Sequence, residues 1–178
     1  MTQAKRSARK QPAAKKSKIA APGFMAAATA AGLDPKVGKT AVKGEYRPSI
    51  VSGSTASLAG SVDMDLTFEN SEPNAARWDY GLGVRKGSEE MAFWVEAHPA
   101  SSTGEVGRML QKLEWLKSKL GEPTFASLSA LTRQAQEAGT AFRWLARTGD
   151  IRIRPGSREA NLLAQRGLAF PKRHVVLP

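Results

Sequence analysis

Two carboxylates and an imidazole stand where they could bind a metal ion and act on a bound substrate. Asp79 lies near the start of one expected strand, and Glu96 and His98 lie near the end of the next, in the stretch FWVEAHP. Two or three carboxylates can hold a hard cation such as Mg²⁺ or Mn²⁺. Such a cation neutralises charge on a phosphate and activates water, the two requirements for hydrolysis of a phosphodiester bond. These residue types therefore suggest metal-assisted hydrolysis.

A third carboxylate is expected on the preceding strand. Residues 61–68, SVDMDLTF, alternate between polar and apolar side chains with a period of two, which is typical of a strand with one buried face. Asp63 and Asp65 share the polar face, and whichever lies nearer the metal end is a candidate ligand. The alternation also fits a simpler interpretation, in which all these acids lie on the solvated face of an antiparallel sheet.

Three strands must position these residues, at about 58–68, 77–85 and 91–97, and the short turns between them predict an antiparallel meander. Around the turn KGSEE, Asp79 lies nine residues before Ser88 and Glu96 lies eight after it. Antiparallel pairing across this turn places the two carboxylates opposite each other at one end of the sheet. A register slip of one residue would turn them to opposite faces.

The remaining elements complete an α+β fold. A capping box formed by Ser102 and Glu105 predicts the start of a helix that ends near Gly121, with apolar side chains at helical spacing. Further along the chain the patterns predict a helix at about 125–138, strands at 141–147 and 151–154, and a helix from Ser157 to Gly167.

A meander followed by a helix, with an Asp at the start of one strand and a Glu-x-basic triplet at the end of the next, resembles the PD-(D/E)XK nuclease superfamily over roughly residues 58–147. The resemblance implies that Asp79 and Glu96 bind Mg²⁺ and that the Ala97 carbonyl completes the shell. It places His98 at the position of the superfamily's usual Lys, which orients or activates water.

The sequence departs from the superfamily pattern in two places. Arg77 and Trp78 stand where the family has a proline before the Asp. His98 lacks the permanent positive charge of a Lys, although an imidazole can act as a general base or bind a softer metal such as Mn²⁺. Gln111 falls where the superfamily often has a polar residue on the following helix.

Positive charge gathers at both ends of the chain. The formal net charge is +11, with +9 in residues 1–48, −6 in 61–106 and +8 in 107–178. A basic chain with an acidic middle is expected of a protein that binds a polyanion and holds a cation at its centre. We therefore expect nucleic acid, DNA or RNA, as the partner.

Residues 1–18 contain seven Lys or Arg and no acid, so this segment is expected to be disordered and to contact phosphates without sequence preference. A solubilising tail or a localisation signal is the alternative. We assign residues 1–48 to a tail and linker and 49–178 to a single domain. The expected nucleic-acid contacts are Lys5, Arg6, Arg9, Lys10, Lys15, Lys16 and Lys18 in the tail, with Arg152 and Arg154 in the expected strand IRIR.

Several classes are excluded by composition. The chain has no cysteine, which rules out disulfides, thiolate nucleophiles and Cys-based zinc sites and fits a reducing cytoplasm. An acid-free leader also leaves an organelle transit sequence open. No apolar run is long enough to span a membrane. The VGKT at 37–40 lacks the glycine that a phosphate-binding loop requires, so no nucleotide cofactor is expected.

The sequence therefore predicts a metal-dependent nuclease-like protein that uses Mg²⁺ or Mn²⁺. A non-enzymatic nucleic-acid-binding protein on the same scaffold is the alternative, with the acids in structural roles. A third possibility is a toxin-like or partner-binding domain whose basic zones contact an acidic protein.

Overall fold

A mixed five-stranded sheet contains the meander expected from the sequence. The computed structural model describes residues 22–147 and 149–178. The strands of this sheet are β1 (Lys36–Val37), β3 (Ala56–Asp63), β4 (Tyr80–Lys86), β5 (Glu89–His98) and β6 (Phe142–Ala146). Their order is β1-β3-β4-β5-β6. The β3, β4 and β5 strands pair antiparallel, and β6 joins β5 in parallel.

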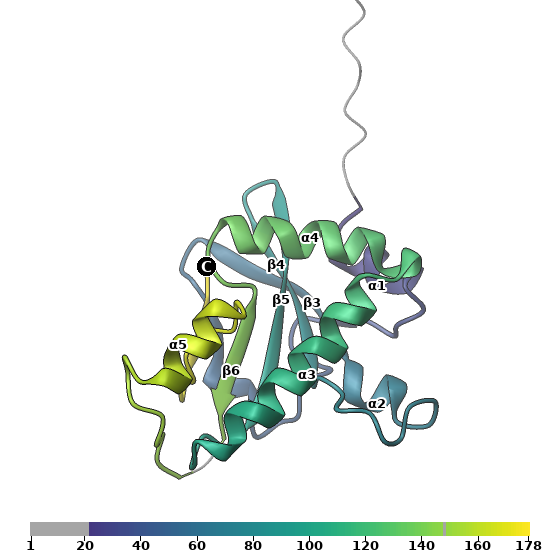
Figure 1. Ribbon diagram of the computed structural model, residues 1–178. Helices are drawn as coiled ribbons and strands as arrows, with labels where there is room; N and C mark the ends of the chain where they lie inside the picture. The colour runs from purple at the N-terminus through teal and green to yellow at the C-terminus, as the bar shows by residue number, and fades with distance from the viewer. Residues whose placement is uncertain (1–21, 148) are drawn as a thin grey trace, which may run out of the picture.

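Helices cover one face of this sheet, and a short strand pair lies against the other. The helices are α1 (Phe24–Ala30), α2 (Met64–Phe68), α3 (Gly104–Leu120), α4 (Ala126–Glu137) and α5 (Arg158–Gln165). The strand pair is β2 (Ile50–Ser52) and β7 (Val175–Leu177), which run parallel. Figure 1 shows α1, α3 and α4 lying across the sheet. The α+β class is therefore confirmed.

No helix within residues 22–147 and 149–178 combines the length and the apolar composition that a membrane span needs.

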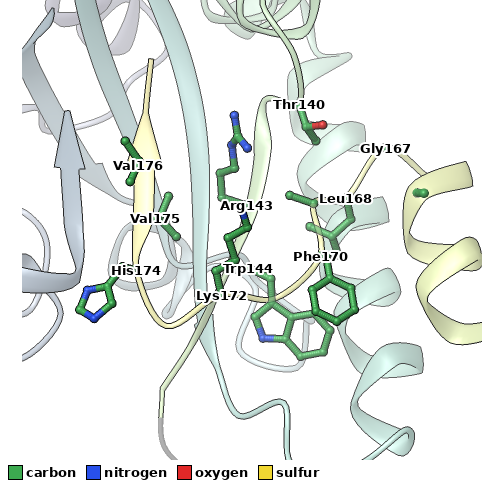
Figure 2. Close-up of a pocket in the computed structure, with 12 residues that line it drawn as sticks. Thr140, Arg143, Trp144, Gly167, Leu168, Phe170, Lys172, His174, Val175 and Val176 are labelled. Atoms are coloured by element: carbon green, nitrogen blue, oxygen red, sulfur yellow. The ribbon is translucent and has the colours of Figure 1, made fainter. Parts of the chain in front are cut away.

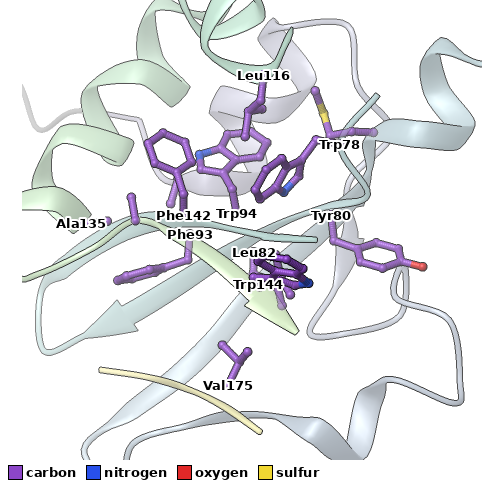
Figure 3. Packing of buried hydrophobic residues seen from close by; sticks show 14 of the residues in the cluster. Trp78, Tyr80, Leu82, Phe93, Trp94, Leu116, Ala135, Phe142, Trp144 and Val175 are labelled. Carbon is purple, nitrogen blue, oxygen red and sulfur yellow. The ribbon is translucent and has the colours of Figure 1, made fainter. Parts of the chain in front are cut away.

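The β5 strand is buried on both of its faces, which explains its near-continuous apolar sequence. Figure 3 shows Trp94 and Leu116 on one side of the sheet and Phe93 and Val175 on the other. All four side chains are almost completely shielded from solvent. The two apolar layers hold the carboxyl end of β5 in place, and the acidic residues are found there.

Two glycines in β4 leave room for side chains from α1 and β5. A Cβ at Gly83 would lie 2.4 Å from Cγ of Phe24, and a Cβ at Gly81 would lie 2.8 Å from the Trp94 ring. Phe24 and Val42 are fully buried. The assignment of residues 1–48 to a tail and linker is therefore wrong for 24–48, where apolar side chains complete the core. Residues 1–21 lie outside the described part of the chain.

The first strand of the meander ends earlier than the alternation predicts. It stops at Asp63, whose carboxylate caps α2 by accepting a hydrogen bond of 2.9 Å from the Leu66 N–H. Phe68 then packs edge-on against Trp115, with 5.4 Å between ring centroids. Ser61, expected on the solvated face, is buried. A local helix cap and an aromatic contact outweigh the period-two pattern here.

The expected strand at 151–154 is not formed. Ile153 is buried, while Arg152 and Arg154 are exposed on either side of it. The outer edge of β6 is already occupied, because the Ala169 N–H donates to the Phe142 carbonyl and the Lys172 N–H donates to the Trp144 carbonyl. With that edge filled, residues 151–154 have no strand partner there.

Candidate active site

The register of β4 and β5 places Asp79 opposite Glu96. Tyr80 pairs with Val95, so the next step along each strand sets Asp79 across from Glu96 on the same face of the sheet. The Asp79 N–H donates to Glu96 Oε2 at 2.9 Å, and the Ala97 N–H donates to Asp79 Oδ2 at 3.0 Å. The predicted convergence of these two carboxylates is confirmed, and the backbone of the opposing strand orients each one.

Lys112 of α3 completes this cluster. Its ammonium contacts Glu96 Oε1 directly and lies 3.6 Å from Asp79 Oδ1. Helix α3 crosses the sheet with Met109, Leu113 and Leu116 buried beneath it. This packing turns Lys112 toward the carboxyl end of β5, so that three ionisable groups from two strands and one helix meet at a single point.

The sequence pointed to the wrong position on this helix. Gln111 is exposed, and Lys112 is half-buried. A signal was present: Lys112 follows Met109 by three residues and precedes Leu116 by four, so it borders the apolar stripe of the helix. Gln111 is turned about 100° away from Lys112, since each residue of an α-helix advances by that angle.

Burial controls the ionisation of the two carboxylates. The Glu96 side chain is 1% exposed and that of Asp79 is 19% exposed. Desolvation, followed by the nearby charge of Asp79, raises the pKa of Glu96 to about 8. Desolvation also raises the pKa of Asp79, against the opposing effect of Lys112. One lysine thus faces two carboxylates, and the cluster carries one negative charge in excess when both are ionised.

His98 extends the cluster along the same face of β5. Its Nε2 lies 2.7 Å from Glu105 Oε2 in the first turn of α3. The expected capping box is therefore wrong: Thr103 is the N-cap and makes no side-chain hydrogen bond, and Glu105 binds His98 instead. The structure places Lys112, rather than His98, against both candidate metal ligands.

The first-strand acids do not join Asp79 and Glu96. Asp63 caps α2, and Asp65 pairs with Arg77 at 2.8 Å. Within residues 22–147 and 149–178, no three His, Asp or Glu side chains are grouped closely enough to hold a metal ion together. The candidate ligand set therefore contains the two carboxylates of Asp79 and Glu96.

This pair of carboxylates suits a hard cation that keeps part of its water shell. Mg²⁺ is commonly held by one or two carboxylates, with water or substrate oxygens filling its other positions. A bound divalent cation would favour the ionised form of both carboxylates and so offset the effects that raise their pKa values. The Ala97 N–H points toward Asp79, and its carbonyl faces the same side because both groups of one strand residue point in one direction.

The predicted nucleic-acid contacts are only partly described. Arg152 and Arg154 are exposed, and the Arg152 N–H donates to the Ala100 carbonyl just beyond β5. This bond fixes the arginine segment near the carboxyl end of β5, where Glu96 and His98 lie. The seven basic residues of 1–18 lie outside the described residues.

Comparison with models of protein families, with curated proteins and with solved structures found no match.

Proposed function

We propose that this chain is a divalent-metal-dependent nuclease that hydrolyses phosphodiester bonds of DNA or RNA. The observation that carries the proposal is the meeting of Asp79, Glu96 and Lys112 at the end of two paired strands. Two carboxylates to hold a cation and one ammonium to face a phosphate or a water are the groups that this chemistry requires.

In this proposal Asp79 and Glu96 would hold Mg²⁺ or Mn²⁺, which would neutralise charge on the phosphate and activate water. Lys112 takes the role that the superfamily gives to its Lys, by orienting the water or stabilising charge on the phosphate. His98 is held by Glu105 at the edge of the site, where it could accept a proton from the attacking water or donate one to the leaving oxygen.

Nucleic acid is the proposed substrate because of the charge around the site. Arg152 and Arg154 are exposed near the end of β5, and the tail adds seven positive charges. Contacts of this kind neutralise phosphates without reading sequence. The lack of cysteine fits action in the cytoplasm.

A second candidate, a nucleic-acid-binding protein without catalysis, is favoured by one specific observation. Lys112 contacts Glu96 directly and Arg77 pairs with Asp65, so two of the acids already have a protein cation as partner. In that case the Lys112 cluster would anchor α3 to the sheet, and Arg152 and Arg154 would account for the binding of nucleic acid.

Cleavage of labelled single- and double-stranded DNA and RNA, with Mg²⁺, Mn²⁺ or EDTA, tests the nuclease proposal. We expect cleavage that needs the metal, and a loss of at least about 100-fold in rate for Glu96→Gln and for Lys112→Gln, as for removal of a charge-stabilising group. Glu89→Gln is the matched control, since Glu89 lies on the same strand and is exposed.

Titration calorimetry with Mn²⁺ separates the two candidate functions. The nuclease proposal requires a heat of binding that Asp79→Asn abolishes. Absence of binding at millimolar Mn²⁺, with or without DNA, together with salt-dependent binding of nucleic acid, would leave the non-catalytic function standing. Deletion of residues 1–18 should weaken nucleic-acid binding and flatten its salt dependence in either case.

A further inference from the structure

A cavity lies at the β6 edge of the sheet, away from the acidic cluster. It has a volume of about 400 Å³, is open to solvent on one side, and is bordered by β6, β7 and the chain that leads into β7. Figure 2 shows Arg143, Trp144 and Phe170 around it. Asp79, Glu96 and Lys112 are not among its lining residues. A volume of this size is typical of a small-molecule site.

Arg143 brings a cation into this cavity without a counter-charge. Its Nε is buried and has no hydrogen-bond partner among the described residues. None of the ion pairs in residues 22–147 and 149–178 involves it. Burial lowers the pKa of Arg143. The guanidinium is therefore partly desolvated and uncompensated.

The fold supplies only a weak substitute for a counter-charge. The Arg143 guanidinium carbon lies 5.7 Å from the centre of the Phe93 ring, within range of a cation–π contact. A desolvated cation without an anion or a full set of hydrogen bonds is costly to the folded state. A ligand anion that reaches the guanidinium would offset this cost, and arginine has the forked geometry to bind carboxylate or phosphate at two points.

The other lining residues indicate which class of anionic ligand fits the cavity. Lys172 also lines the cavity, so Arg143 and Lys172 together bring more positive charge than one carboxylate would neutralise. A phosphate monoester carries a charge close to −2 at neutral pH. Leu168, Phe170 and Val175 form apolar walls that suit a flat, apolar body.

We propose that this cavity binds a phosphate monoester attached to a flat ring system, such as a nucleoside monophosphate, with the phosphate on Arg143 and the ring against the apolar wall. The site is separate from the acidic cluster and does not depend on the proposed nuclease activity. Its occupant would tie β7 and the preceding chain to β6, the edge strand of the main sheet.

Titration calorimetry of the full chain in EDTA tests this proposal, with AMP, adenosine and inorganic phosphate as probes. We expect AMP to bind at least tenfold more tightly than either fragment, because only AMP reaches both the guanidinium and the apolar wall. Arg143→Met should weaken AMP binding at least tenfold. Arg133→Met, which removes an exposed arginine of α4, is the matched control and should bind AMP as the unmutated protein does.

Thermal melting adds a readout that a purely structural arginine would not give. AMP should raise the melting temperature of the unmutated protein and of Asp79→Asn, but not that of Arg143→Met. Arg143→Lys keeps the positive charge but lacks the forked guanidinium, so AMP should raise its melting temperature by less than that of the unmutated protein. This variant replaces Arg143→Met in the test if the Met variant does not fold. No binding of AMP at millimolar concentration, or equal binding by the Arg143 variants, would overturn the proposal.

Discussion

Helix α3 carries two clusters with the same composition and different properties. Near its middle, Lys112 meets Asp79 and Glu96; near its end, Lys119 meets Glu72 at 2.5 Å and Glu122 at 3.0 Å. Each cluster contains one lysine and two carboxylates. A count of charges cannot distinguish them.

Burial separates the two clusters. The Glu96 side chain is 1% exposed, whereas that of Glu72 is 30% exposed. Burial raises the pKa of Glu96, whereas hydrogen bonds from Lys119 and Trp115 lower the pKa of Glu72. In the Lys119 cluster, hydrogen bonds and partial contact with water therefore favour the charged form of Glu72. The Lys112 cluster holds charges that its surroundings disfavour, which is expected of a functional site more than of a structural one.

The largest expected effect follows from removal of the central lysine. Lys112→Met leaves two buried carboxylates without their cation, and such a change typically costs about 3–5 kcal/mol in the free energy of unfolding. Urea denaturation at pH 8 in EDTA measures it. Mn²⁺ should recover part of the loss if Asp79 and Glu96 bind the metal. A loss below about 1 kcal/mol would show that the two clusters are equivalent.

An intermediate effect is expected from pH. The pKa of Glu96 is raised from 4.5 to about 8 in the folded protein, so between these values the folded state holds a proton that the unfolded state has released. The free energy of unfolding should therefore fall as pH rises through this window, by up to about 1.4 kcal/mol per pH unit. Glu96→Gln should remove most of this slope in urea titrations at several pH values.

The Lys119 cluster should respond to pH in the opposite sense. Because the pKa of Glu72 is lowered in the folded protein, its contribution is present above the ordinary pKa of 4.5 and is lost as pH falls below it. Glu72→Gln should therefore flatten the pH dependence of stability on the acid side. Between pH 5 and 8 it should lower the free energy of unfolding by a constant amount and leave the slope unaltered. A change of slope confined to the neutral range would contradict this assignment.

The smallest effect is expected from Lys119→Met. Ion pairs with partly exposed partners contribute about 0–1 kcal/mol and are screened by salt. The difference in the free energy of unfolding between this variant and the unmutated protein should stay below about 1 kcal/mol and shrink in high salt. A loss as large as that of Lys112→Met would mean that contact with Phe68, 4.6 Å from the Lys119 ammonium to the ring centre, dominates.

The sequence by itself determined the parts of this protein that depend on local pattern. The turn between β4 and β5 has a fixed length, so counting residues from it correctly placed Asp79 opposite Glu96. Apolar spacing located α3 and α4, and Ser157 marked the start of α5 by accepting the Ala160 N–H. Each of these features is set by residues close together in the chain.

Only the tertiary structure decided which groups meet the two carboxylates and how they ionise. The rotation of α3 on the sheet brings Lys112 to Glu96 and leaves Gln111 in solvent. That rotation depends on core packing across distant segments. The same holds for Arg143, whose lack of a partner is visible only once β7 and residues 167–172 lie beside β6. Glu96 and Arg143 differ from most other charged residues in their burial, and burial depends on the whole fold.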